Sequence, residues 1–215
     1  PALDYSIQRE GEIAMLRLVD GEKPENIQGL TSRSSNGINV TGDAPVISDI
    51  DLFPFPERNK FWAISDEDKK TVDVSYICSI RGCPYRCNYC ASPQHWKRDK
   101  TQYRSPESVI NEMRYLKENY WNTEKEYDFS ASANIGPKRD LKIKDNTIVY
   151  FVDDIFTVKK KRIKTILRMM IDQKLDMNWK CEARTDHLDE EICELMSKAG
   201  CERVKLGFES GSERL

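Results

Sequence analysis

Three cysteines lie within eight residues of this chain, in the segment Cys83-Pro84-Tyr85-Arg86-Cys87-Asn88-Tyr89-Cys90. A short loop with this Cys-x-x-x-Cys-x-x-Cys spacing can hold three corners of an iron–sulfur cube. A cube with three protein ligands leaves its fourth iron without one, and an open metal position is typical of catalytic sites. The spacing therefore predicts a cluster ligated by Cys83, Cys87 and Cys90, on a fold that can present such a loop.

Two other metal sites remain open for these cysteines. One is a zinc site with Cys78 as fourth ligand, and the other is a ferredoxin-like electron carrier. Zinc usually takes a second close cysteine pair, whereas Cys78 lies in an alternating apolar segment that favours a small core residue. Cysteines elsewhere in the chain are interpreted as core or half-buried thiols rather than as ligands of another cluster: Cys181, Cys193 and Cys201.

Composition excludes several classes of protein. Charged residues make up 33% of the 215 residues, the mean hydropathy is −0.68, and the net charge of −2 comes from interspersed acids and bases. Such a balance gives no electrostatic reason to expect binding to nucleic acid or a membrane. No apolar run approaches the roughly 18 residues of a spanning helix, and the N-terminus lacks the pattern of a signal peptide. We expect a cytoplasmic protein, where thiols stay reduced.

The N-terminal region, residues 1 to about 60, is rich in Gly, Pro, Asn and Asp. Residues 12–19 are predicted to form a short helix with Ile13, Leu16 and Val19 on one face. Residues 26–40 and 41–50 are predicted to form hairpin-like strands, the first broken at Asn36-Gly37. An extended linker with Pro54 and Pro56 follows.

From about residue 71 the pattern alternates between strand and helix. Strands are predicted at 72–80, 147–152, 177–183 and 204–208, with residues 76, 78 and 80 on the buried face of the first. Helices are predicted after the Ser105 N-cap and Pro106, at 163–171, and at 192–199 before Gly200. Residues 121–145 are predicted to be a surface insertion. Three and a half strand–helix units imply an α/β fold with a parallel sheet and helices on one face.

Polar residues follow the predicted strands at the points where these end. They are the cysteine loop, Asp153-Asp154, Arg184 and Glu209. Parallel α/β sheets place their functional sites at this edge. By contrast, the run from Lys159 to Arg162 is interpreted as an exposed first helical turn. The two histidines, at 95 and 187, are interpreted as surface or loop residues.

Several segments together resemble the radical S-adenosylmethionine (SAM) superfamily, in the branch that carries an N-terminal cobalamin-binding domain. Beyond the cysteines with Tyr89, the resemblance covers roughly residues 70–215. The segments are Arg81-Gly82-Cys83-Pro84-Tyr85, Cys90-Ala91-Ser92-Pro93, Tyr103-Arg104-Ser105-Pro106-Glu107, Phe151-Val152-Asp153-Asp154-Ile155-Phe156-Thr157 and Gly207-Phe208-Glu209-Ser210-Gly211-Ser212.

The resemblance implies a partial (βα) barrel of radical SAM type, truncated after about the fourth strand and preceded by a small irregular or β connector. Residues 1–60 would be the connector after a cobalamin-binding domain, and residues 61–215 the first part of the radical SAM core. We expect a longer protein, because the chain has no Asp-x-His-x-x-Gly cobalamin motif and stops directly after a strand with a ligand-type motif.

The resemblance also implies cofactors and contacts. A 4Fe–4S cluster would cleave SAM reductively to a 5′-deoxyadenosyl radical, with electrons from a flavodoxin or ferredoxin. Asp153 or Asp154 would accept from the SAM ammonium group, and Arg184 would bind its carboxylate. Glu209 would accept from the ribose hydroxyls, and Tyr89 would contact adenine. We assign no side chain as a catalytic acid, base or nucleophile.

One departure from the family pattern leaves a choice open. Many members end the second strand with a Gly-Gly-Glu type motif, where this chain has Val152-Asp153-Asp154. The expected reaction is cobalamin-dependent radical methylation or a related carbon-skeleton modification such as cyclisation. Alternatives are a methylthiotransferase, which usually has three further N-terminal cysteines that this chain lacks before Cys78, and a non-catalytic iron–sulfur or zinc module.

Overall fold

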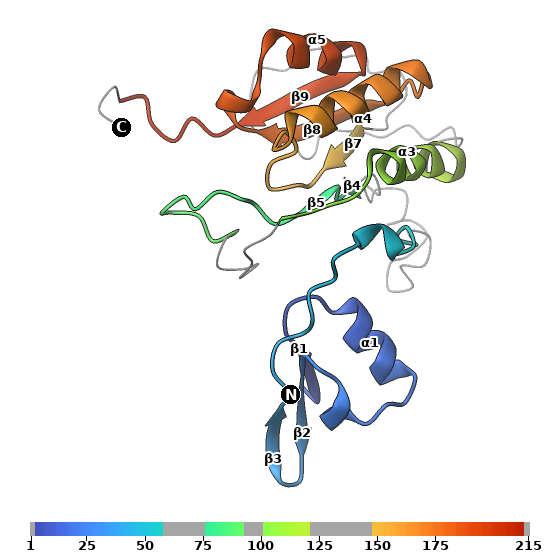
Figure 1. Ribbon diagram of the computed structural model, residues 1–215, viewed down its shortest axis with the longest axis vertical. Coiled ribbons are helices and arrows are strands. Elements are labelled where there is room, and N and C mark those ends of the chain that lie inside the picture. Colours follow the sequence, from blue (N-terminus) through green and yellow to red (C-terminus); the bar gives the residue numbers. More distant parts are fainter. Residues whose placement is uncertain (1–2, 58–75, 93–100, 121–147, 213–215) are drawn as a thin grey trace, which may run out of the picture. The chain divides into compact units, whose positions relative to one another are not determined.

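The computed structural model describes residues 3–57, 76–92, 101–120 and 148–212, which form two compact units that divide between Ile50 and Asp51 (Figure 1). Each unit is described by itself. The predicted domain boundary at residue 60, the insertion at 121–145, His95 and the first residues of the 72–80 strand lie outside the described residues.

The first unit is a three-stranded antiparallel sheet with one helix. Its sheet order is β1-β2-β3, and Ser34 pairs with Gly37 across the predicted turn. No strand forms within residues 41–50, and β1 was not predicted. The elements are β1 (Tyr5–Ile7), α1 (Glu12–Val19), η1 (Pro24–Asn26), β2 (Leu30–Ser34) and β3 (Gly37–Val40), followed by η2 (Ile50–Leu52) at the boundary.

Helix α1 is confirmed, but its predicted buried face is wrong. Ala14 is buried against Ile27 and Leu30, because the small side chain lets the helix approach the sheet closely. The expected core residues Leu16 and Val19 are 57% and 75% exposed, and Ile13 is exposed as well.

The second unit contains the predicted parallel sheet. Its strand order is β4-β7-β8-β9, and every neighbouring pair is parallel. Side chains of one sheet face share a core with all three helices, so the helices cover one face as expected (Figure 1). The elements are β4 (Tyr76–Ile77), α3 (Pro106–Tyr120), β7 (Ile148–Phe151), α4 (Lys160–Asp172), β8 (Asn178–Ala183), α5 (Glu190–Lys198) and β9 (Cys201–Leu206).

The first strand differs from the prediction. Tyr76 and Cys78 are exposed, while Ile77 and Ser79 are fully buried, so the alternation has the opposite phase up to Ser79; Ile80 is buried as predicted. The chain leaves the parallel ladder at Ser79 and forms β5 (Ile80–Arg81), which pairs antiparallel with β6 (Gln102–Tyr103). The cause is that the backbone N–H groups of Ser79 and Ile80 donate to the Asp153 carboxylate instead of to a neighbouring strand.

The core is aromatic at its centre. Phe151, Phe156 and Trp179 are fully buried with ring centroids 4.4–5.6 Å apart. The indole Nε1 of Trp179 donates to the Ala199 carbonyl at 2.8 Å. Gly200 ends the turn after α5 as predicted, with φ of +87°, and a Cβ there would lie 2.5 Å from the Met177 carbonyl oxygen.

Helix α3 begins as predicted. The Ser105 hydroxyl accepts from the Ser108 N–H at 3.1 Å, and Pro106 is the first helical residue. Its predicted face is buried throughout, namely Val109, Ile110, Met113 and Leu116.

Helix α4 corrects one expectation. Lys159, Lys160 and Lys161 are exposed, but Arg162 turns inward and donates to the carbonyls of Arg104 (2.9 Å) and Ser79 (3.1 Å). The long arginine side chain lets the guanidinium reach two buried carbonyls, so not every residue of a basic run faces solvent.

Cys181 is buried and Cys201 half-buried as expected, whereas Cys193 is exposed. Among the described helices, none has the length and apolar character needed to cross a bilayer.

Candidate functional site

The cysteine loop directly follows β5 and carries three thiols that interact electrostatically. Cys83, Cys87 and Cys90 are all half-buried and reduced. The Cys90 N–H donates to the Cys87 carbonyl at 3.0 Å, and the Ser92 N–H donates to the Cys90 sulfur at 3.5 Å. Burial raises the pKa of the Cys83 thiol, and nearby Asp154 and the two other cysteines act in the same direction. Backbone donors to cysteine sulfur are a common means of tuning an iron–sulfur cluster.

The three cysteines have the chemistry of ligands to a four-iron cube. Within the described ranges, no three His, Cys, Asp or Glu side chains converge closely enough to bind one metal ion. A four-iron cube does not require such convergence, because each cysteine binds a different iron. The Cys78 thiol donates to the Ile80 carbonyl at 3.1 Å, and burial raises its pKa to about 11.

Asp153 is committed to a structural contact. It is 2% exposed, and its Oδ1 accepts from the backbone N–H groups of Ser79 (2.6 Å) and Ile80 (2.9 Å). Its Oδ2 accepts from the Ser79 hydroxyl at 2.5 Å. The carboxylate thus turns the chain out of β4 and fixes the start of the segment that leads into the cysteine loop.

Burial raises the pKa of Asp153 to about 6, although the bonds from Ser79 and Ile80 and the charge of Arg162 oppose the shift. The folded state therefore holds this proton more tightly than the unfolded state, whose aspartates titrate near about pH 4. Stability contributed by this group should fall by on the order of 2 kcal/mol as pH rises from about 4 to 6.

Asp153→Asn should remove this pH dependence, since the amide oxygen can still accept the two backbone bonds. Urea unfolding of both proteins across this pH window measures the difference in free energy of unfolding. A difference that does not change with pH would contradict the assignment of the pKa near 6 to Asp153.

Asp154 differs from its neighbour. It is exposed and accepts from the Ser92 hydroxyl at 2.5 Å, so it lies beside the end of the cysteine loop. Its charge contributes to the raised pKa of Cys83. Of the two aspartates, only Asp154 presents its carboxylate on the accessible side.

Arg184 follows β8 and lies over the ring of Tyr85 from the cysteine loop, with 4.1 Å between Cζ and the ring centroid. Asp186 accepts from its Nε and Nη2 at 3.0 and 2.9 Å. The guanidinium is therefore held on one face by an aromatic ring and on one edge by a carboxylate. Asp186 does not use the Nη1 edge, which leaves that edge to face another anion.

Glu209, after β9, and Tyr89, in the cysteine loop, are far apart in sequence but interact with each other. The Glu209 carboxylate lies within hydrogen-bonding reach of the Tyr89 hydroxyl, which raises the pKa of Tyr89 to about 12. Glu209 has a positive φ of 54°, and a Cβ on Gly207 would lie 2.6 Å from its Oε1. Gly207 thus gives the carboxylate room to fold back toward the cysteine loop.

His187 is a residue that sequence reasoning missed. It was expected at the surface or in a loop; it does lie in the loop after β8, but only 7% of it is exposed. Its Nε2 lies 2.5 Å from the Tyr85 hydroxyl, and its Nδ1 lies 3.2 Å from Thr157 Oγ1. The available signal was its position three residues after Arg184, in a strand-end loop of the predicted sheet.

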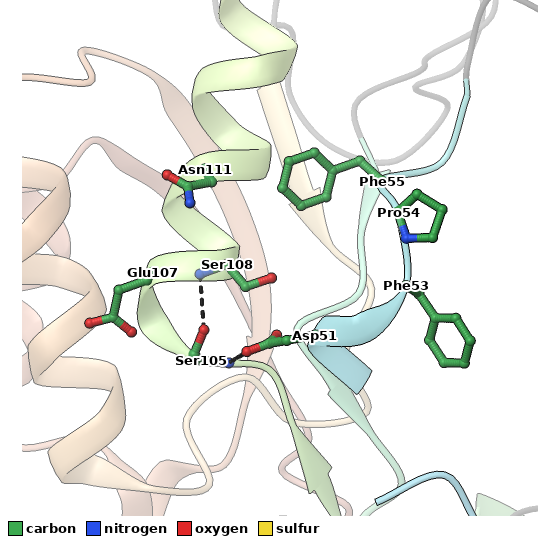
Figure 2. A pocket seen from close by; sticks show the side chains of 8 residues that line it. All are labelled: Asp51, Phe53, Pro54, Phe55, Ser105, Glu107, Ser108 and Asn111. Atoms are coloured by element: carbon green, nitrogen blue, oxygen red, sulfur yellow. Dashed lines mark hydrogen bonds between the residues drawn. The ribbon is translucent and has the colours of Figure 1, made fainter. Parts of the chain in front are cut away.

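A surface hollow of about 420 Å³ lies elsewhere in the second unit, where the segment around Phe53 and Phe55 passes the start of α3. Figure 2 shows Asp51 bonded to the Ser105 N–H at its edge. None of the predicted site residues lines this hollow. It is formed by the packing of the linker, and we assign it no ligand.

Comparison with known proteins decides the family. The sequence pattern of the radical SAM superfamily matches residues 77–215. The chain belongs to the radical SAM superfamily. Its cofactors are accordingly a 4Fe–4S cluster and SAM.

A methyltransferase of Pyrococcus horikoshii, described as uncharacterized, is 27% identical over the whole chain and 42% of its own length. An anaerobic magnesium-protoporphyrin IX monomethyl ester cyclase of Synechocystis is 23% identical over 99% of the chain and 38% of its length. The structure of the cobalamin-dependent SAM radical enzyme OxsB, with aqua-cobalamin and SAM bound, matches with a TM-score of 0.68. It is 18% identical over 98% of the chain and 28% of its length. The predicted resemblance to the cobalamin-associated branch is thus confirmed, and the chain spans about two fifths of these curated relatives.

Proposed function

We propose that this chain is the first part of the catalytic core of a radical SAM enzyme. When bound, its 4Fe–4S cluster supplies the electron that cleaves SAM to a 5′-deoxyadenosyl radical. The observation that carries this proposal is that three strand-end polar groups gather around the cysteine loop. Asp154 bonds Ser92, Arg184 lies over Tyr85, and Glu209 lies close enough to Tyr89 to raise its pKa.

Each of these groups has the chemistry for one part of SAM. Cys83, Cys87 and Cys90 would hold three irons and leave the fourth to the amino acid end of SAM. Asp154 would accept from the ammonium group, and the Arg184 guanidinium would bind the carboxylate. Glu209 would accept from the ribose hydroxyls and Tyr89 would contact adenine. Asp153 is left with the structural role that its three hydrogen bonds already define.

The neighbouring aspartates allow a matched test. Asp154→Asn should weaken SAM binding by about tenfold or more, because a hydrogen bond to a charged group contributes about 1.5–3 kcal/mol. Asp153→Asn should change SAM affinity by no more than about twofold. The measurement is the SAM-induced change in the spectrum of the reduced cluster, titrated without oxygen.

Equal losses in the two aspartate variants would mean that Asp154 acts only through the fold. A larger loss in Asp153→Asn would reverse our assignment. Either result leaves the enzyme class intact, since that is tested by SAM cleavage in the unsubstituted protein.

That cleavage test separates the proposed enzyme from a non-catalytic module. With dithionite and SAM, the reconstituted protein should release 5′-deoxyadenosine. A zinc module or a ferredoxin-like carrier should release none and should show no spectral response to SAM. Failure of both readouts in a protein with four irons per chain would sink the proposal.

For the complete protein we propose cobalamin-dependent radical methylation, supported by the methyltransferase name of one relative and by cobalamin in the matching structure. Residues 1–60 would then connect a cobalamin-binding domain to the core that starts near residue 61. Cyclisation is the second candidate, because another relative is named a cyclase. The electron would come from a flavodoxin or ferredoxin in the cytoplasm, where the thiols stay reduced.

A further inference from the structure

His187 joins three loops that follow three different strands. It lies in the loop after β8, bonds Tyr85 in the cysteine loop and bonds Thr157 in the loop after β7. The two partners lie 102 and 30 residues away along the chain. Because hydroxyl groups both donate and accept, either neutral tautomer of the imidazole satisfies both contacts. A buried side chain with both ring nitrogens bonded has one orientation.

That orientation is passed to Tyr85. Its hydroxyl is fixed by His187 Nε2 at 2.5 Å, and the two rings lie 5.5 Å apart. Tyr85 lies between Cys83 and Cys87 in sequence, so fixing its ring also restrains the loop that carries the thiols. The buried anchor thus sets the position of an aromatic side chain inside the cluster-binding segment.

The face of the same ring supports Arg184. The guanidinium carbon lies 4.1 Å from the ring centroid, a short cation–π distance. Nothing else in the described residues links Arg184 so directly to the cysteine loop. The distance from the cluster ligands to the proposed carboxylate-binding guanidinium is therefore set by the Tyr85 ring, which His187 holds in place.

We propose that Tyr85 and His187 are positioning residues that keep Arg184 in register with the cluster, so that SAM can bind the open iron and the guanidinium together. This inference rests on the proposed function. A misplacement of about 1 Å in such a constellation is enough to weaken binding strongly.

Tyr85→Phe tests the hydrogen bond while leaving the ring in place. We expect the variant to load four irons and to unfold close to the wild-type midpoint, but to bind SAM about three- to tenfold more weakly, as expected for one lost hydrogen bond. The readouts are iron content, thermal unfolding and the SAM-dependent spectrum of the reduced cluster.

Two replacements of His187 separate positioning from packing. Glutamine can place its amide near the position of Nε2 and asparagine near that of Nδ1. His187→Gln should therefore retain SAM affinity within about threefold, whereas His187→Asn should match Tyr85→Phe. Thr157→Val removes the other contact only and should affect SAM binding less than Tyr85→Phe does.

Wild-type SAM affinity in Tyr85→Phe would overturn the inference, as would equal losses in His187→Gln and His187→Asn. If the variants lose iron in proportion to their loss of SAM affinity, Tyr85 and His187 only stabilise the cysteine loop, and the inference is wrong. If wild-type protein itself neither responds to SAM nor cleaves it, the proposed function fails instead, which the same titration reveals.

Discussion

Replacing Cys87 with alanine should abolish assembly of the four-iron cluster and, with it, all SAM cleavage. Cys87 is the middle of the three cysteines. Its carbonyl accepts a hydrogen bond from the Cys90 N–H at 3.0 Å, which closes a turn between the two residues. A cube left with two cysteine ligands is not held, since each thiolate binds a separate iron. Iron and sulfide analysis with electron paramagnetic resonance after reconstitution should show less than about one tenth of the wild-type cluster.

Two cysteines provide controls for this result. Cys193→Ala, at an exposed position of α5, should load iron normally. Cys78→Ala should do the same, because its thiol bonds the Ile80 carbonyl instead of facing the loop as a ligand. Loss of metal from the Cys78 variant, or a full cluster in Cys87→Ala, would refute the ligand set of Cys83, Cys87 and Cys90.

Glu112→Ala should lower the free energy of unfolding by about 3–5 kcal/mol. Glu112 is 1% exposed and pairs with Arg104, whose side chain is 11% exposed. Without it the guanidinium stays buried, and the other carboxylate that pairs with it in the described part of the chain is Asp51, at 3.9 Å. Arg104 also bonds the Ser108 carbonyl at 3.1 Å, so the loss would loosen the start of α3.

An exposed glutamate gives the matched comparison. Glu191→Ala removes two surface pairs, with Lys164 and Arg168, and should cost less than about 1 kcal/mol because solvent screens such pairs. Urea unfolding of the two variants measures both values. A cost for Glu112→Ala as small as that for Glu191→Ala would mean that Arg104 is satisfied by its backbone contacts.

The pair Arg104–Glu112 also shows how far motif reading reaches. The segment around Arg104 was recognised as part of the family pattern, and Ser105 was correctly predicted as an N-cap. That Arg104 is a structural anchor is seen only in the fold, where its guanidinium pairs with Glu112, eight residues later in α3. The motif indicated that the residue matters, and the fold shows what it contacts.

Helices were predicted most accurately where apolar periodicity was long, as in α3 and α4, because burial of one face repeats every turn. The prediction failed for short elements. In α1 the larger apolar residues were expected inside, yet Ala14 packs and Leu16 is exposed. In the first strand the phase was wrong, because two ladder N–H groups bind Asp153 instead of a neighbouring strand.

The sequence by itself determined the parallel sheet, the helices on one face and the placement of polar residues at strand ends. These follow from local periodicity and from the geometry that all parallel strands share. Only the tertiary structure decided which aspartate is accessible, that Arg162 turns inward and that His187 bonds Tyr85. Each depends on a hydrogen bond between residues 30 to 102 positions apart, such as that from Ser79 to Asp153, and local sequence pattern carries no record of such partners.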